Sequence, residues 1–190
     1  MPILDEKQLN TVHQFARSAE AYCLLLETHT DLTDEVFAIR CAELLAALYR
    51  DMLMLPEIDH DAIDWHWEVA KAIRYMKHST NFYTSLYDRL NANQHDLYWL
   101  YFDPFDETSG LSFPLSMTLL EIYENLRRDV EFYRLGTERG FLYASYQWRI
   151  SALVHWGQHL TDALRVLHEI IVTDWNKRPS NDQAEDEDDD

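Results

Sequence analysis

Residues 148–168 read WRISALVHWGQHLTDALRVLH, and this stretch decides the fold. At helical spacing, the stretch and its flanks place mostly apolar side chains on one stripe. The stripe comprises Phe141, Trp148, Ala152, His155, His159, Val166 and Ile170. An imidazole in a core stripe must be hydrogen-bonded, bound to a metal ion or tolerated at a cost, because an unpaired polar group is expensive to bury. The stretch therefore predicts a buried helix with two candidate site residues, His155 and His159.

The same helix is predicted to be long and central. It begins near Thr137 and reaches about Thr173, which at about 1.5 Å per residue is on the order of 50 Å. A second apolar row accompanies the first and consists of Tyr146, Ile150, Leu153, Leu160, Leu164, Leu167 and Ile171. Two apolar rows indicate a helix buried on two sides. Gly157 in its middle costs about 1 kcal/mol relative to alanine, which predicts the close approach of a neighbouring backbone.

The rest of the chain predicts further helices and few turns. Only 4 glycines and 5 prolines occur in 190 residues, so turn signals are scarce. Apolar spacing predicts helices over residues 6–27, 33–55, 63–90 and 114–135, with Pro56 ending the second and Gly136 the fourth. We therefore expect residues 1–176 to form a single all-α domain, an up-and-down bundle of about five helices.

The charge of the chain is strongly negative and uneven. The formal net charge is −18, and seven acidic residues but no basic one fall within residues 181–190. Residues 177–190 are predicted to be an acidic disordered tail. Three roles are open for it: solvation alone, which is the default, binding of a basic protein, and mimicry of nucleic acid. The remaining chain is also acidic. Neither nucleic acid nor an anionic membrane is expected as a partner, because both are bound mainly through Lys and Arg.

The sequence predicts a cytoplasmic protein. Residues 1–6, MPILDE, lack the basic start and apolar run of a signal peptide. No stretch approaches the roughly 20 apolar residues of a membrane span. Cys23 and Cys41 fall in separate predicted helices, which favours two small buried thiols over a disulfide.

The two histidines of the last helix have a spacing suited to metal binding. Residues at i and i+4 lie on one helix face, so both imidazoles can bind one ion. Asp162 lies one turn further on, and Glu121 on the preceding helix offers another carboxylate. Neither of these two helices carries the Glu-x-x-His pair of di-iron bundles. A structural interpretation, in which the histidines bond carboxylates or hydroxyls, is favoured. No cofactor is then expected, and a divalent transition metal is the alternative.

Two further groups of residues stand out. Tyr123, Glu124, Asp129 and Arg149 are predicted to form a buried polar network, structural by default. Within the loop segment 91–114, the run at residues 98–105 carries five rings, Tyr98, Trp99, Tyr101, Phe102 and Phe105. We expect these rings to pack onto the bundle, because so long a loop needs its own anchoring.

Four sequence blocks resemble a known family. They are LAALYR (45–50) with LPEI (55–58), YW (98–99) with FDPF (102–105), LLEIY (119–123) with Leu126, and WR (148–149) with HWGQH (155–159) and DALR (162–165). In this order they resemble an uncharacterised bacterial domain of unknown function. The resemblance spans about residues 45–168 and implies an all-helical fold without an established activity, so no catalytic residue is carried over. Family members tend to place acids where this chain has Met117, Thr118 and Asn125, which leaves Glu121 and Glu124 for a polyacidic site.

The function hypotheses follow from what the sequence contains and lacks. No nucleophile elbow or phosphate-binding loop occurs, so the leading hypothesis is a non-enzymatic protein-interaction or adaptor module. Its contact surface would include exposed rings such as Trp67 or Trp99. Its partner would be a protein, and the negative charge of this chain favours a basic one. The alternative is a metal-dependent hydrolase or oxidase that uses His155 and His159. A second alternative is a small-ligand pocket roofed by the rings of residues 98–105.

Overall fold

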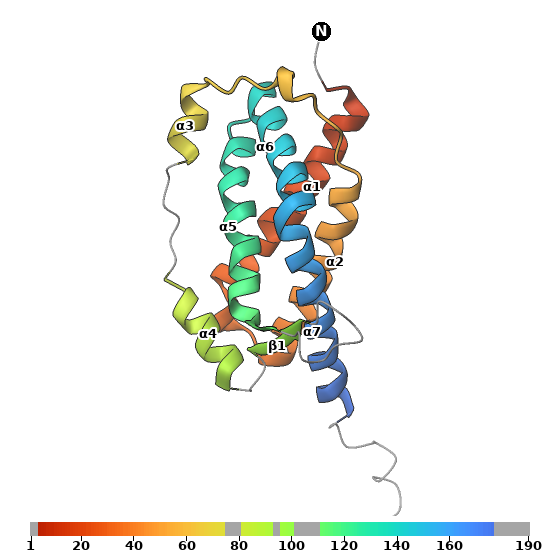
Figure 1. Ribbon diagram of the computed structural model, residues 1–190, viewed down its shortest axis with the longest axis vertical. Helices are drawn as coiled ribbons and strands as arrows, with labels where there is room; N and C mark the ends of the chain where they lie inside the picture. The colour runs from red at the N-terminus through yellow and green to blue at the C-terminus, as the bar shows by residue number, and fades with distance from the viewer. Residues whose placement is uncertain (1–3, 75–80, 93–95, 101–110, 177–190) are drawn as a thin grey trace, which may run out of the picture.

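Long helices pack side by side along one axis (Figure 1). The computed structural model describes residues 4–74, 81–92, 96–100 and 111–176. Helix α1 (Glu6–Glu27) packs against α2 (Asp34–Leu53) and α5 (Leu115–Arg134). Helix α6 (Glu138–Ser151) leads into α7 (Gly157–Asn176), and α7 contacts both α2 and α5. The predicted all-α bundle is thus confirmed, while the predicted tail at 177–190 lies outside the described residues.

The helix ends follow the local capping signals. Asp5 and Gln8 form a reciprocal capping box at the start of α1, and the Thr33 hydroxyl accepts a hydrogen bond from an N–H of α2. Gly136, with a φ of 64°, ends the α5 segment as predicted, because this backbone conformation strains other residues. Thr137 then caps α6.

The prediction of one helix over residues 63–90 is wrong. The structure instead has a short 3₁₀ turn η2 (His60–Ala62), then α3 (Glu68–Arg74) and α4 (Tyr83–Ala92). A side-chain bond explains the delayed start: Asp64 accepts a hydrogen bond from the backbone N–H of His66. Such local bonds compete with helix formation. A second 3₁₀ turn, η1 (His29–Asp31), joins α1 to α2.

The long C-terminal helix is confirmed, with one irregular turn in its middle. Residues Ala152–Trp156 form a π turn, in which the N–H of Gly157 donates to the carbonyl of Ala152, five residues earlier. A Cβ added to Gly157 would overlap that same carbonyl oxygen. The predicted approach of a neighbouring backbone is therefore wrong: the backbone atoms that crowd this position belong to the same helix, at Ala152.

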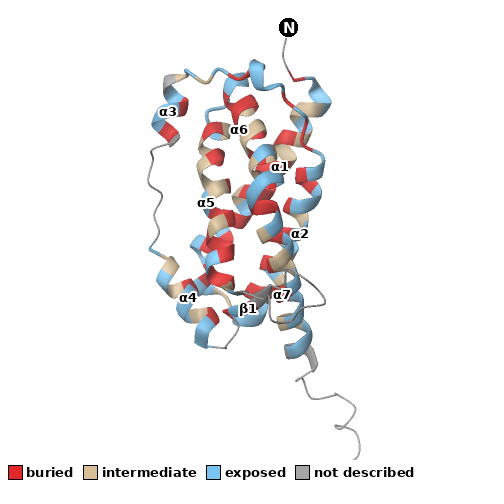
Figure 2. Ribbon diagram, viewed as in Figure 1, coloured by how far each residue is buried: buried red, intermediate tan, exposed pale blue. Residues whose placement is uncertain are grey.

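The π turn keeps one row of side chains in the core. Trp148, Ala152, Trp156 and Leu160 are all buried, and they follow one another every four residues. Figure 2 shows that buried positions lie along the long helices of the bundle. In a regular α-helix each step of four residues would turn the row by about 40°. The wider turn absorbs this drift, so both tryptophans face the core. Trp148 lies with its ring centroid 4.9 Å from that of Phe15 on α1.

Several side chains of the predicted rows face outward near this turn. Leu153 and Ile150, which the second predicted row places in the core, are 64% and 38% exposed. His155, predicted to lie in the buried stripe, is also exposed. The two predicted rows assumed an uninterrupted α-helical period, and the π turn breaks that period at residues 152–156.

A small hairpin closes one end of the bundle. Strand β1 (Leu97–Leu100) pairs antiparallel with β2 (Leu111–Pro114), where a loop was predicted. Tyr98 is buried, and its hydroxyl lies 2.8 Å from that of Thr118 on α5. The predicted packing of the rings is therefore seen for Tyr98. The other four rings lie outside what the structure describes: the side chain of Trp99 and all of Tyr101, Phe102 and Phe105.

Cys23 and Cys41 are free and buried, as predicted. Burial raises the pKa of both thiols, which keeps them in the unreactive protonated form. Among the described helices, none combines the length and apolar character that crossing a bilayer requires.

Candidate metal centre

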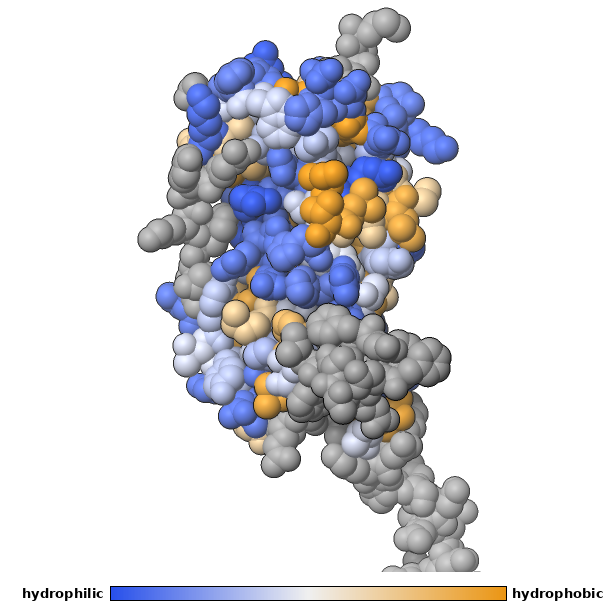
Figure 3. All heavy atoms as spheres, in the orientation of Figure 1, coloured by the Kyte–Doolittle hydropathy of each residue, from blue (hydrophilic) through white to orange (hydrophobic). Residues whose placement is uncertain are grey.

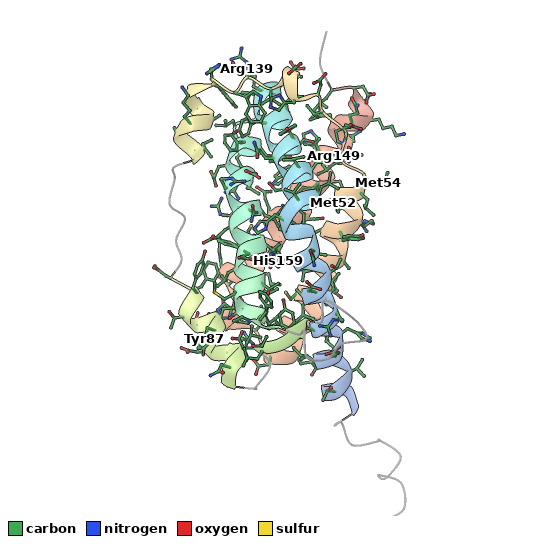
Figure 4. All side chains as sticks on the ribbon, in the orientation of Figure 1. Met52, Met54, Tyr87, Arg139, Arg149 and His159 are labelled. Carbon is green, nitrogen blue, oxygen red and sulfur yellow. The ribbon has the colours of Figure 1, made fainter. Side chains whose placement is uncertain are left out.

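Glu121, His155 and His159 converge from three elements. Glu121 projects from α5, whereas His155 lies in the π turn and His159 in the first turn of α7. One potential ligand atom from each side chain lies within 4.8 Å of the other two. The closest contact joins His159 Nε2 to Glu121 Oε2 at 3.1 Å. Figure 4 labels His159 where α5 and α7 run side by side.

The cluster lies at the surface of the seam between α5 and α7. The side chains of His159 and Glu121 are 24% and 42% exposed, and His155 is exposed. The two imidazoles meet edge to face, with ring centroids 5.2 Å apart and an interplanar angle of 88°. The structure thus places Glu121 beside His159, and both of these side chains are partly buried, whereas His155 is exposed.

Asp162 borders the cluster one helical turn beyond His159. Its Oδ2 atom is buried and makes no hydrogen bond with the described residues. Burial raises the pKa of this carboxyl, although the charges of Arg165 and His159 oppose the shift. The pKa of the Tyr98 phenol is raised, mainly by burial. The negative charges of nearby Asp162 and Glu121 raise this pKa further. Asp162 is therefore a second carboxyl beside the centre, held partly out of water.

The three converging side chains suit a divalent transition metal. Zinc binds imidazole nitrogen and carboxylate oxygen at about 2.0–2.2 Å, so two donors on one ion lie at most about 4.3 Å apart. The Glu121–His159 contact of 3.1 Å already falls in that range. A bound ion would take the place of this direct contact between Nε2 and the carboxylate oxygen. Two imidazoles and one carboxylate also leave coordination positions for water or a substrate.

Comparison with protein families decides the classification of the chain. The model of the family described as "Domain of unknown function (DUF5063)" matches residues 6–173. The chain belongs to the DUF5063 family. The resemblance seen in the sequence is thereby confirmed. A comparison with curated proteins gives no match.

A solved structure shares the architecture of this DUF5063 chain. The crystal structure of protein BF1032 from Bacteroides fragilis, a structural genomics target, superposes with a TM-score of 0.64 at 20% sequence identity. The alignment covers 90% of this chain and 95% of BF1032. At this identity the likeness shows the fold alone.

The four residues of the predicted polar network bond four different partners in the DUF5063 fold. The hydroxyl of Tyr123 donates to Glu27 at 2.8 Å, and Glu124 accepts from the hydroxyl of Tyr83 at 2.5 Å. The remaining two bonds join Arg128 to Asp129 and Arg149 to the carbonyl of Leu55. Three of these contacts join different elements: α5 to α1, α5 to α4, and α6 to the segment after α2. The Arg128–Asp129 pair lies within α5, and none of the four residues belongs to the cluster of Glu121, His155 and His159.

Proposed function

We propose that this protein binds one divalent transition-metal ion through Glu121, His155 and His159, and that the ion's open positions hold water or a substrate. The observation that carries the proposal is the convergence of three ligand atoms, from α5, the π turn and α7, within 4.8 Å of one another. Imidazole and carboxylate donors are typical of zinc, iron and nickel sites, and the chain's acidity favours cation binding.

The π turn supports the proposal independently. Such turns are rare and occur frequently at functional sites. Here the turn contains His155 and directly precedes the helical turn that contains His159. A glycine at residue 157 gives it room, since any larger residue would meet the carbonyl of Ala152. The irregular turn therefore contains one proposed ligand, His155, and lies directly before a second, His159.

The arrangement suits hydrolysis by a metal-activated water. Catalytic zinc sites combine three protein ligands with one water, whose pKa the ion lowers to about 7. Asp162 supplies a further carboxyl beside the centre, with one oxygen free of hydrogen bonds from the described residues. The set of two histidines and one carboxylate is shared by zinc hydrolases and non-haem iron oxygenases. The extra carboxyl of Asp162, which can act as a base toward bound water, favours the hydrolase of these two alternatives.

Zinc titration of the full-length chain tests the proposal. We expect one Zn²⁺ per chain after chelator treatment of protein purified without a histidine tag, measured by calorimetry and elemental analysis. His159→Ala and Glu121→Gln should each weaken binding at least about tenfold, because each removes a direct ligand. Cobalt in place of zinc should give visible absorption bands that both variants lose.

His168→Ala is the matched control, because this exposed histidine lies on α7 outside the cluster. Its affinity and cobalt spectrum should equal those of the wild type. Circular dichroism identifies any variant that fails to fold. Substoichiometric zinc, or a His159→Ala variant that binds zinc like the control, would overturn the proposed centre.

A second candidate function, partner binding, is favoured by an exposed apolar surface. Figure 3 shows hydrophobic surface where the α6–α7 junction meets the end of α2. Leu53, Met54, Leu153 and Val154 are 59%, 61%, 64% and 75% exposed. Contiguous apolar surface of this kind marks interaction sites. Since the chain carries a net charge of −18, the complementary partner is a basic amphipathic segment.

Substitution within this surface tests the second candidate. A photo-crosslinker at residue 54 should capture a partner whose crosslinked segment is basic and binds again as a synthetic peptide. Leu153→Asp should abolish peptide binding, because it places a charge in an apolar contact. Leu24→Asp, at a similarly exposed residue (58%) on α1, is the control and should bind normally. Equal peptide binding by both variants would contradict the interaction surface.

A further inference from the structure

A cavity lies at the end of the bundle opposite the hairpin. Its volume is about 240 Å³, and it is bounded by Ile63, Asp64, Trp67, Arg139, Leu142 and Tyr143. Figure 4 labels Arg139 at this end, where the segment before α3 crosses the start of α6. The cavity shares no residue with the proposed metal centre, so it is an independent site.

The inner wall of the cavity is apolar and fixed. Ile63, Leu142 and Tyr143 are buried, and Trp67 is half-buried. The Tyr143 ring is held from behind by Phe132, with ring centroids 4.2 Å apart. A rigid wall with two aromatic rings favours a flat apolar group, because such rings stack or meet edge to face with other rings.

The mouth of the cavity carries a positive group. The Arg139 guanidinium lies 3.5 Å from a carboxylate oxygen of Asp64, with the two side chains 66% and 45% exposed. So long and exposed an ion pair is weak. Arg139 is also the second residue of α6, and a helix start favours negative charge. A carboxylate therefore fits at this position, and Asp64 marks where it can sit.

We propose that this cavity binds a small aromatic monocarboxylate. The ring of the ligand lies between Trp67 and Tyr143. The carboxylate of the ligand forms an ion pair with Arg139 and replaces Asp64 as the partner of that guanidinium. The volume is below the roughly 300–1,000 Å³ of pockets for drug-sized ligands, which limits the ligand to one or two rings. The net charge of −18 disfavours ligands with several negative charges.

Fluorine NMR of the full-length chain labelled with 5-fluorotryptophan tests the proposal with phenylacetate as the probe. The chain has 6 tryptophans, and Trp67→Phe assigns the resonance of residue 67. We expect phenylacetate to shift that resonance in a saturable manner and to leave the Trp156 resonance unchanged. Phenylacetamide, which lacks the charge, should bind about tenfold more weakly.

Two opposite substitutions sharpen the test. Arg139→Gln should weaken phenylacetate binding about tenfold, because the charged hydrogen bond is lost. Asp64→Asn should strengthen it, because the competing carboxylate is gone while its Oδ1 can still accept from His66. Arg40→Gln is the control, since Arg40 is likewise 66% exposed and ion-paired. The site would be refuted if the Trp67 resonance does not move at about 10 mM phenylacetate, a concentration at which even weak binding is detected. Equal affinities of the Arg139→Gln and Arg40→Gln variants for phenylacetate would refute it as well.

Discussion

Replacing Trp156 by alanine should lower the free energy of unfolding by about 3–5 kcal/mol. The indole is fully buried in the π turn, and its ring centroid lies 6.3 Å from that of Phe15 on α1. Its Nε1 makes no hydrogen bond with the described residues, so the loss comes from packing and the cavity left behind. Urea unfolding followed by circular dichroism measures the change.

Val154→Ala provides the comparison for this prediction. Val154 lies two residues before Trp156 in the same turn but is 75% exposed. Its substitution should change stability by no more than about 0.5 kcal/mol. A loss below about 1 kcal/mol for Trp156→Ala would show that the indole does not pack in the core, and that the four-residue row through Trp148 and Leu160 is misplaced.

Gly157→Ala should destabilise the protein by about 1–3 kcal/mol, although helix propensity alone predicts a gain of about 1 kcal/mol. The two effects differ in sign, so the measurement separates them. The alanine Cβ would overlap the carbonyl oxygen of Ala152, and the π turn must shift to relieve the contact. Because His155 lies in that turn, zinc affinity should fall together with stability.

Gln158→Ala is the neighbouring control for the glycine substitution. Gln158 is exposed in the same helix, so helix propensity dominates its replacement, and stability should stay equal or rise by a few tenths of a kcal/mol. If Gly157→Ala is as stable as this control and binds zinc normally, the turn does not need a glycine. Calorimetric zinc titration and urea unfolding supply both readouts.

Apolar spacing predicted where several of the long helices begin, and the structure shows what caps them there. Asp5, Thr33 and Thr137 each directly precede a helix and cap it. The prediction of one long helix over residues 63–90 was wrong, and the reason is local. Its apolar spacing is helical, yet the side chain of Asp64 bonds the backbone of His66 and delays the helix to Glu68.

The candidate site was only partly predictable. Spacing on one helix shows that His155 and His159 are neighbours, but which residue of α5 faces them depends on how the two helices align. The sequence offered both Glu121 and Glu124, and packing brings Glu121 to His159 while Glu124 bonds Tyr83. The signal for the π turn was present in the buried row Trp148, Ala152, Trp156 and Leu160, whose constant step of four does not fit an α-helix.

The wide turn also affects how the longest helix can move. Regular helices are stiff rods, and sharp bends in them occur at irregular turns of this kind. Residues 152–156 are therefore the place where this long helix is most easily bent, with α6 on one side and α7 on the other. His155 lies within the turn and His159 just beyond it. We therefore expect a change in the bend to change the distances from both imidazoles to Glu121.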